Sequence, residues 1–87
     1  MKIKNGFVVR SIAGESVVVA LGAASKNFNG IIKLNETGRF LWDKLAVGCE
    51  SEELVEAILS EYEIDRATAE SDIARFIETL EGANIIE

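Results

Sequence analysis

The strand-like and helical parts of this chain meet in one segment, Leu34-Asn35-Glu36-Thr37-Gly38-Arg39-Phe40-Leu41-Trp42. Asn35 is a favourable helix N-cap, because its side-chain oxygen accepts an N–H group that the first helical turn leaves unpaired. Glu36 places a negative charge at the positive end of the helix dipole. Phe40, Leu41 and Leu45 form an apolar face that we expect to dock on the preceding sheet. The segment therefore predicts a junction between a sheet and a helix.

Three strand-like runs precede this junction. Residues 7–12 and 16–21 are rich in Val and Ile, and the short Ala13-Gly14-Glu15 connection between them predicts a β-hairpin. A polar loop over residues 22–29 leads to a third strand, which we place at residues 28–34. Three such strands predict one antiparallel sheet with an apolar face to cover.

Three helices follow the junction. The first spans residues 35–47, with Gly48 suited to cap its C-terminus. The second begins at Ser51, an N-cap type of residue, and the third is capped by Asp65 and ends at Gly82. Residues 84–87 are expected to form a short extended tail against the core. The order βββααα predicts a single α+β domain over residues 1–87. Apolar residues recur at helical spacing in both later helices: Leu54, Val55, Ile58, Leu59 and Tyr62, then Ala69, Ile73, Phe76, Ile77 and Leu80.

The net charge of −6 is divided unevenly along the chain. Residues 1–48 carry seven basic and three acidic side chains, whereas residues 49–87 carry two basic and twelve acidic ones. One interpretation is that the later helices have solvated acidic faces; the other is that a mixed-charge surface orients a charged peptide. In either case the balance disfavours nucleic acid as a partner, because nucleic acid binding needs clustered Lys and Arg.

His and Cys, which commonly supply catalytic bases, nucleophiles and metal ligands, are scarce in this chain. The chain has no His, and its single Cys, Cys49, has no second thiol with which to pair. We therefore expect no catalytic site, no metal and no cofactor. The N-terminus does not resemble a signal peptide, and no apolar run reaches the length of a membrane span, so a reducing cytoplasm is the expected location, without membrane association.

Several short motifs follow one another in a set order, and together they carry a family resemblance. They are Ile31-Ile32-Lys33-Leu34, Asn35-Glu36-Thr37-Gly38, Phe40-Leu41-Trp42, Ser51-Glu52-Glu53-Leu54-Val55, Tyr62-Glu63-Ile64-Asp65, and Asp72-Ile73 with Phe76-Ile77 and Leu80. In this order they resemble the PqqD family, whose members recognise leader peptides of ribosomally made, post-translationally modified peptides. The resemblance covers roughly residues 6–86. It implies a winged helix-turn-helix-like arrangement and a non-catalytic function.

The third strand is the candidate binding element. Lys33 is the only charge in residues 28–34, so an edge at this strand is poorly protected against pairing. Such an edge is either covered by a helix or meant to pair with another chain. The family resemblance implies the second option: a leader peptide adds beside this strand, in a groove whose other wall is the last helix. The implied peptide-binding residues are Asn29, Gly30, Ile31, Ile32 and Lys33 on the strand, and Asp72, Arg75, Phe76 and Thr79 on the helix.

Individual roles follow from the same resemblance. Ile31 is expected to contact an apolar leader side chain, while Lys33, Asp72 and Arg75 read charges on the leader. Phe76 either forms the floor of the groove or belongs entirely to the core.

The resemblance also implies a second partner, the modifying enzyme. That enzyme is a radical S-adenosylmethionine enzyme, a lasso-peptide leader peptidase or a cyclodehydratase in different relatives, and the pathway (pyrroloquinoline quinone, lasso peptide or another) stays open. The alternatives are a protein-docking module without leader binding and a DNA-binding winged helix. DNA binding is disfavoured because the last helix offers only Arg66 and Arg75 against several acids. An unpaired edge permits a monomer or a weak homodimer.

Overall fold

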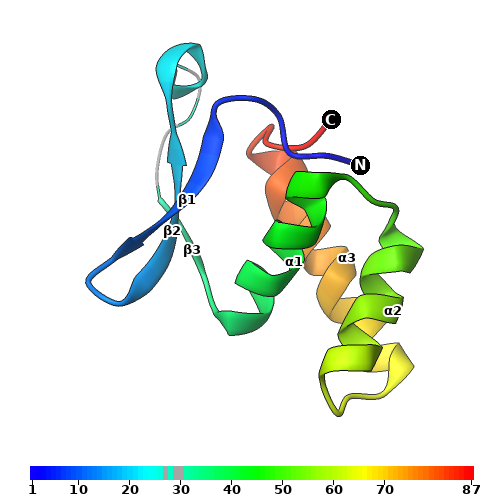
Figure 1. Cartoon of the computed structure of the whole chain (residues 1–87). Helices are drawn as coiled ribbons and strands as arrows, with labels where there is room; N and C mark the ends of the chain where they lie inside the picture. Colours follow the sequence, from blue (N-terminus) through cyan, green and yellow to red (C-terminus); the bar gives the residue numbers. More distant parts are fainter. Residues whose placement is uncertain (27, 29–30) are drawn as a thin grey trace.

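Three strands form one antiparallel sheet in the order β1-β2-β3 (Figure 1). The computed structural model describes residues 1–26, 28 and 31–87. β1 (Phe7–Ile12) and β2 (Glu15–Ala20) are joined by Ala13 and Gly14, whose φ angles are 53° and 81°. Two left-handed residues in a two-residue loop are typical of the type I′ turn, whose twist matches that of the strands. The predicted hairpin is confirmed, with β2 beginning one residue earlier than expected.

The third strand is shorter than the sequence predicted. β3 (Ile32–Leu34) pairs with β2, while Ile31 precedes the strand and Phe28 lies in no strand. Residues 29 and 30 lie outside the described part of the chain. The Phe28 ring packs edge-to-face on Phe7, with 5.5 Å between the ring centroids, so its apolar character serves the core rather than a strand. A 3₁₀ helix, Gly22–Lys26, occupies part of the predicted loop.

Helix α1 (Glu36–Val47) begins and ends as the sequence predicted. The Asn35 side chain accepts the N–H of Gly38 at 2.8 Å, which satisfies one of the unpaired donors of the first turn. Gly48 follows the helix with a φ of 102°, a left-handed conformation that favours glycine. The junction between sheet and helix is therefore confirmed.

The two later helices differ at one cap. α2 (Ser51–Glu61) has Glu50, not Ser51, as its N-cap, and the Glu50 N–H donates to the Glu53 carboxylate at 2.9 Å. α3 (Arg66–Gly82) is capped by Asp65 as predicted. Hydrogen bonds from the Thr68 hydroxyl and N–H hold the pKa of the Asp65 carboxyl below its ordinary value. No helix among the described residues is long and apolar enough to cross a membrane.

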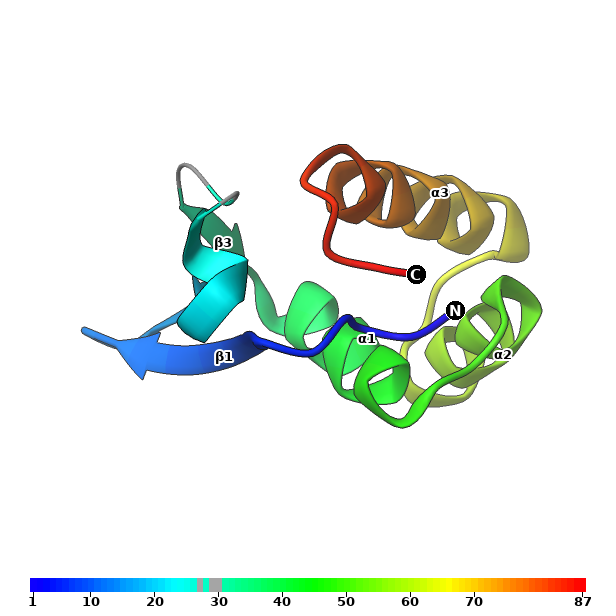
Figure 2. The same ribbon diagram turned by 90° about the horizontal axis from the view of Figure 1, so that it is seen from above.

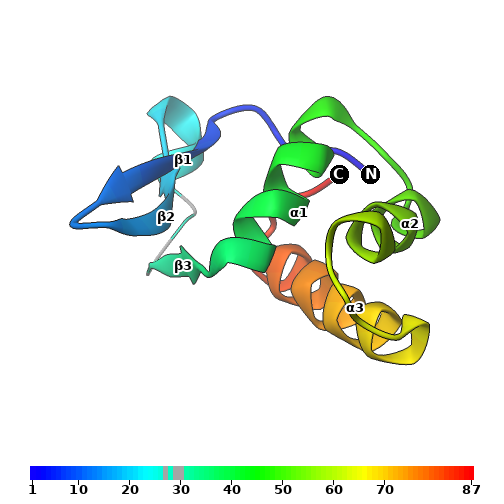
Figure 3. The ribbon, with the colours of Figure 1, turned by 60° about the horizontal axis from the view of Figure 1, so that its bottom comes forward.

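The core lies between one face of the sheet and the three helices. The inner face of the sheet contributes Phe7, Val9, Val18, Ile32 and Leu34. α1 lies beside the sheet, between it and α2, and all three helices lie on the same side of the sheet (Figures 2 and 3). The helices fill the space with buried side chains, namely Leu41, Trp42, Leu45, Leu54, Val55, Ile58, Ala69, Ile73 and Leu80.

Phe40 is the exception on α1. Whereas Leu41 and Leu45 are buried in the core as expected, Phe40 is half-buried and packs edge-to-face with Tyr62, the residue that follows α2. The ring centroids are 5.7 Å apart. Phe40 thus joins α1 to α2, and its predicted docking on the sheet is wrong.

The two ends of the chain close the core together. Ile85 is fully buried, and Ile86 forms a bridge with Ile3. The Lys4 N–H donates to the Ile85 carbonyl at 2.8 Å, and the Glu87 N–H donates to the Lys2 carbonyl at 3.0 Å. The extended tail is therefore confirmed, and its partner is the N-terminal segment (Figure 1). The structure as a whole confirms the α+β class and the winged helix-turn-helix-like order βββααα.

Candidate functional site

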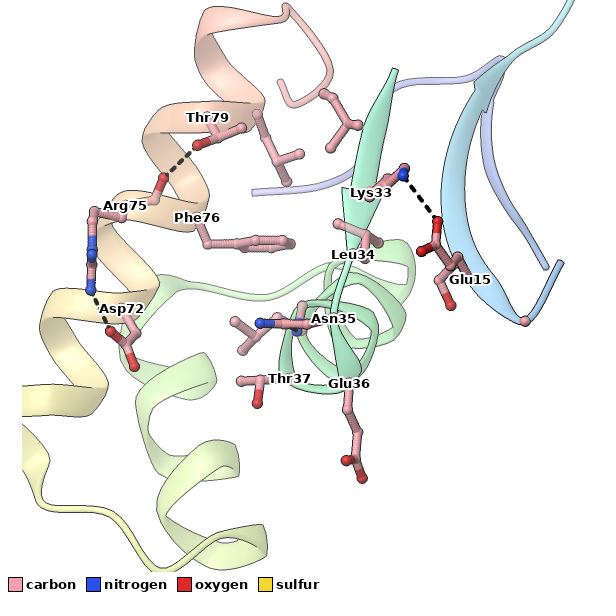
Figure 4. A pocket seen from close by; sticks show the side chains of 16 residues that line it. Glu15, Lys33, Leu34, Asn35, Glu36, Thr37, Asp72, Arg75, Phe76 and Thr79 are labelled. Atoms are coloured by element: carbon pink, nitrogen blue, oxygen red, sulfur yellow. Dashed lines mark hydrogen bonds and ion pairs between the residues drawn. The ribbon is translucent and has the colours of Figure 1, made fainter. Parts of the chain in front are cut away.

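A groove of about 1000 Å³ separates β3 from α3 (Figure 4). Because β3 is the last strand of the sheet, one side of its backbone has no partner strand among the described residues and faces this groove. α3 forms the opposite wall with Asp72, Arg75, Phe76 and Thr79. These residues are three or four positions apart, which places them on one side of a helix. The groove is thus an open sheet edge facing a helix.

Phe76 links the groove to the core. Its ring points from α3 towards β3 and Leu34 (Figure 4). The residue is half-buried, and it packs against the buried core while it also lines the groove. Phe76 is therefore part core and part groove wall, and the alternative that it belongs entirely to the core is wrong.

Each wall of the groove carries an ion pair of its own. On the strand side, Lys33 Nζ lies 3.1 Å from the carboxylate of Glu15, which comes from the start of β2. On the helix side, Arg75 lies 2.7 Å from the Asp72 carboxylate. The Thr79 hydroxyl donates to the Arg75 carbonyl at 3.0 Å. The charges that were expected to read a leader are therefore already balanced within each wall.

The structure brings together six of the nine predicted site residues. These are Ile32, Lys33, Asp72, Arg75, Phe76 and Thr79. Ile31 does not line the groove, and its exposed fraction is 74%. Asn29 and Gly30 lie outside the described residues.

Two further segments line the groove that the sequence did not indicate. The hairpin contributes at one end, because Ser16 pairs with Leu34 across the sheet. The first turn of α1 contributes where it leaves β3. The additional lining residues are Gly14, Glu15, Ser16, Leu34, Asn35, Glu36, Thr37, Gly38, Leu41 and Leu80.

Cys49 lies outside the groove. It follows α1, and its burial, with the nearby Glu53 carboxylate, raises the pKa of its thiol. Within residues 1–26, 28 and 31–87, no group of three or more His, Cys, Asp or Glu side chains is arranged to hold a metal ion.

Comparison with known protein families decides the relationship. The family model for coenzyme PQQ synthesis protein D (PqqD) matches residues 14–86, from the hairpin turn to the buried tail. The chain belongs to the PqqD family. The resemblance read from the sequence motifs is therefore confirmed. A comparison with curated proteins found no match.

Two solved structures resemble this PqqD-family domain over nearly its whole length. TbiB1 in complex with the TbiA(β) leader peptide has a TM-score of 0.78 and 32% sequence identity, covering 100% of this chain and 95% of TbiB1. A lasso peptide synthetase B1 complexed with the leader peptide has a TM-score of 0.74 and 23% identity, covering 97% and 93% of the two chains. The second similarity supports the fold alone. Both of those proteins were solved with a leader peptide.

Proposed function

We propose that this PqqD-family domain binds the leader peptide of a ribosomally synthesised precursor and presents the precursor to a modifying enzyme. The observation that carries the proposal is the unpaired edge of β3, which faces α3 across an open groove. The leader-bound TbiB1, with 32% identity over the whole chain, supports it.

The binding mode is β-augmentation. Main-chain hydrogen bonds to the free side of β3 supply affinity that depends little on sequence, and alternate side chains of the added strand supply specificity. Half of those side chains point into the groove, towards Phe76 and Leu80. A charged leader residue has to compete with the Lys33–Glu15 or Asp72–Arg75 ion pair. Apolar contact at Phe76 is therefore the larger source of specificity.

The domain acts without chemistry of its own. Holding the leader raises the effective concentration of the attached core peptide at the enzyme. The enzyme is a radical S-adenosylmethionine enzyme, a leader peptidase or a cyclodehydratase. Each of these enzymes needs its substrate peptide to stay bound during the reaction. The domain meets this need in the same way for all three, by holding the leader.

An NMR titration tests leader binding. The ¹⁵N-labelled domain is titrated with the leader peptide encoded beside its gene, and a scrambled peptide is the control. We expect saturable shifts in β3 and in residues 72–79 with the leader alone. Equal shifts with both peptides, or none with either, would favour a docking module that does not recognise leaders.

A pair of substitutions on α3 tests the groove itself. Phe76→Ala removes the aromatic wall, and we expect leader affinity to fall by about tenfold or more, which corresponds to about 1.4 kcal/mol. Ile77→Ala is the matched control, because Ile77 is also half-buried on α3 but lines a separate hollow between α2 and α3. Fluorescence anisotropy of a labelled leader measures both. If the two variants lose affinity equally, the groove assignment is wrong.

A further inference from the structure

The register of the sheet determines which backbone groups of β3 face the groove. At the open end of the β1–β2 hairpin, the Leu21 N–H donates to the Gly6 carbonyl at 2.6 Å, in line with the pairing of the two strands. Hydrogen-bonded and non-hydrogen-bonded pairs alternate along antiparallel strands. Alternate residues of β2, beginning with Glu15, therefore direct their backbone groups to β1. Ser16 and Val18 direct theirs to β3.

Lys33 is consequently the residue of β3 that can hydrogen bond an added strand. Ser16 pairs with Leu34 and Val18 pairs with Ile32, so the N–H and C=O groups of Leu34 and Ile32 are directed to β2. Lys33 lies between them, and both of its backbone groups are directed away from β2. A leader strand is therefore anchored on the main chain of Lys33.

This anchor fixes which leader side chains enter the groove. The leader residue opposite Lys33 shares the face of the Lys33 side chain, and its two neighbours share the face of Ile32 and Leu34. The neighbour beside Leu34 meets the apolar surface of Phe76 (Figure 4). The next leader side chain on this face is two positions further on, past the end of β3, where α1 begins. The spacing is the same in either direction of the leader.

Glu36, the first residue of α1, lines this end of the groove. The groove is lined by three carboxylates and two cations, and Glu36 is the carboxylate that forms no ion pair with any described residue. Arg39, one turn further along α1, lies 3.2 Å from Asp43 instead. Glu36 and Asp72 lie towards one end of the groove and Thr79 towards the other (Figure 4). The α1 end of the groove therefore has an uncompensated negative charge.

We propose that Glu36 selects leaders with a Lys or Arg two positions from the apolar residue that packs on Phe76. This inference rests on the proposed function and names the class of leader that the groove accepts. A basic side chain at this position pairs with the exposed Glu36 carboxylate without displacing an ion pair of the domain. An acidic side chain there is disfavoured, because it sets like charges against each other. Charge thus adds specificity to the larger apolar contact.

A charge swap between domain and leader tests the proposal. Anisotropy at low salt measures the affinity of the leader encoded beside the same gene, and each Lys and Arg of the leader is replaced in turn by Glu. We expect one replacement to weaken binding to the wild-type domain by about threefold or more, and Glu36→Lys to weaken binding of the unaltered leader by a similar factor. The two changes together should restore the affinity. Both losses should shrink in about 0.5 M salt.

The charge swap also separates leader selection from helix stability. Glu36 stabilises the positive end of the α1 dipole with or without a leader, and a change in the leader does not repair a loss of that stability. Glu78→Lys is the matched control, because Glu78 is exposed on α3 and does not line the groove. Leader affinity of this variant should stay at the wild-type value.

The outcomes distinguish this inference from leader binding itself. If the wild-type domain binds the leader but no leader replacement restores the affinity of Glu36→Lys, selection by Glu36 is wrong and leader binding stands. Restoration at a leader residue with another spacing from the apolar residue, which is identified by its loss of effect in Phe76→Ala, would overturn the register on Lys33. If the wild-type domain does not bind the leader, both proposals are wrong.

Discussion

Ala13 holds a backbone conformation that is unfavourable for an alanine. Its φ of 53° is left-handed, and this conformation costs a residue with a Cβ about 1–2 kcal/mol. Asparagine tolerates it better, and Asn-Gly is a favoured pair in type I′ turns. We predict that Ala13→Asn raises the free energy of unfolding by about 0.5–1 kcal/mol. Urea denaturation at neutral pH measures the change.

The same substitution in a helix provides the control. Ala46 is exposed on α1, where asparagine is a poorer helix former than alanine, so Ala46→Asn should lower the free energy of unfolding by up to about 0.7 kcal/mol. Opposite signs at the two positions would attribute the effect to the turn. A loss of stability at both positions would mean that the left-handed φ of Ala13 does not lower the free energy of unfolding.

At the scale of elements, the edge of the sheet at β3 faces α3 across the groove. With a leader at about one hundred times its Kd, we predict that amide exchange slows about a hundredfold for the β3 N–H groups that point away from β2. Hydrogen exchange followed by NMR makes this measurement. The outward amides of β1, at the other edge of the sheet, are the internal control. Protection of β1 instead of β3 would place the peptide on the wrong edge for our proposal.

The elements were predictable where local chemistry fixes them. Asn35, Gly48 and Asp65 cap their helices as expected because caps depend on a few neighbouring residues. β3 was predicted too long because Phe28 is apolar for a different reason, its contact with Phe7. A single sequence does not distinguish a strand residue from a loop residue that packs on the core.

The groove was predictable on its two walls and not at its ends. Both walls were expected from the family resemblance, and the spacing of Asp72, Phe76 and Thr79 added that these residues share one side of the helix. Glu15 and Ser16 line the groove because of the register between β2 and β3, which depends on tertiary packing. The Lys33–Glu15 ion pair depends on the same register. The sequence therefore did not predict that Glu15 balances the charge of Lys33.

At the scale of the whole molecule, a small core depends on both chain ends. A domain of this size has a free energy of unfolding of roughly 4–13 kcal/mol. Ile85 is fully buried, so Ile85→Ala should cost about 2–5 kcal/mol through lost burial and the cavity it leaves. We predict a large fall in the urea midpoint, or an unfolded chain at the upper limit.

Val47→Ala is the matched truncation for this test. Val47 is the last residue of α1, and its exposed fraction is 84%. The free energy of unfolding of the Val47→Ala variant should therefore differ from that of the wild type by no more than about 0.5 kcal/mol. Ile85→Val, which removes one methylene, should fall between the two, at about 0.5–1.5 kcal/mol. A tolerated Ile85→Ala would mean that the tail is not part of the cooperative core.

The open edge of β3 also affects the solubility of the domain. An unpaired strand edge pairs with extended segments of other chains, and this pairing promotes aggregation. A leader strand occupying that edge would shield it, so the substrate would act as a solubility factor for the protein that carries it. Expression beside its precursor should accordingly leave less of the domain in inclusion bodies than expression alone. The feature that recruits the peptide is then also the reason the domain benefits from having it.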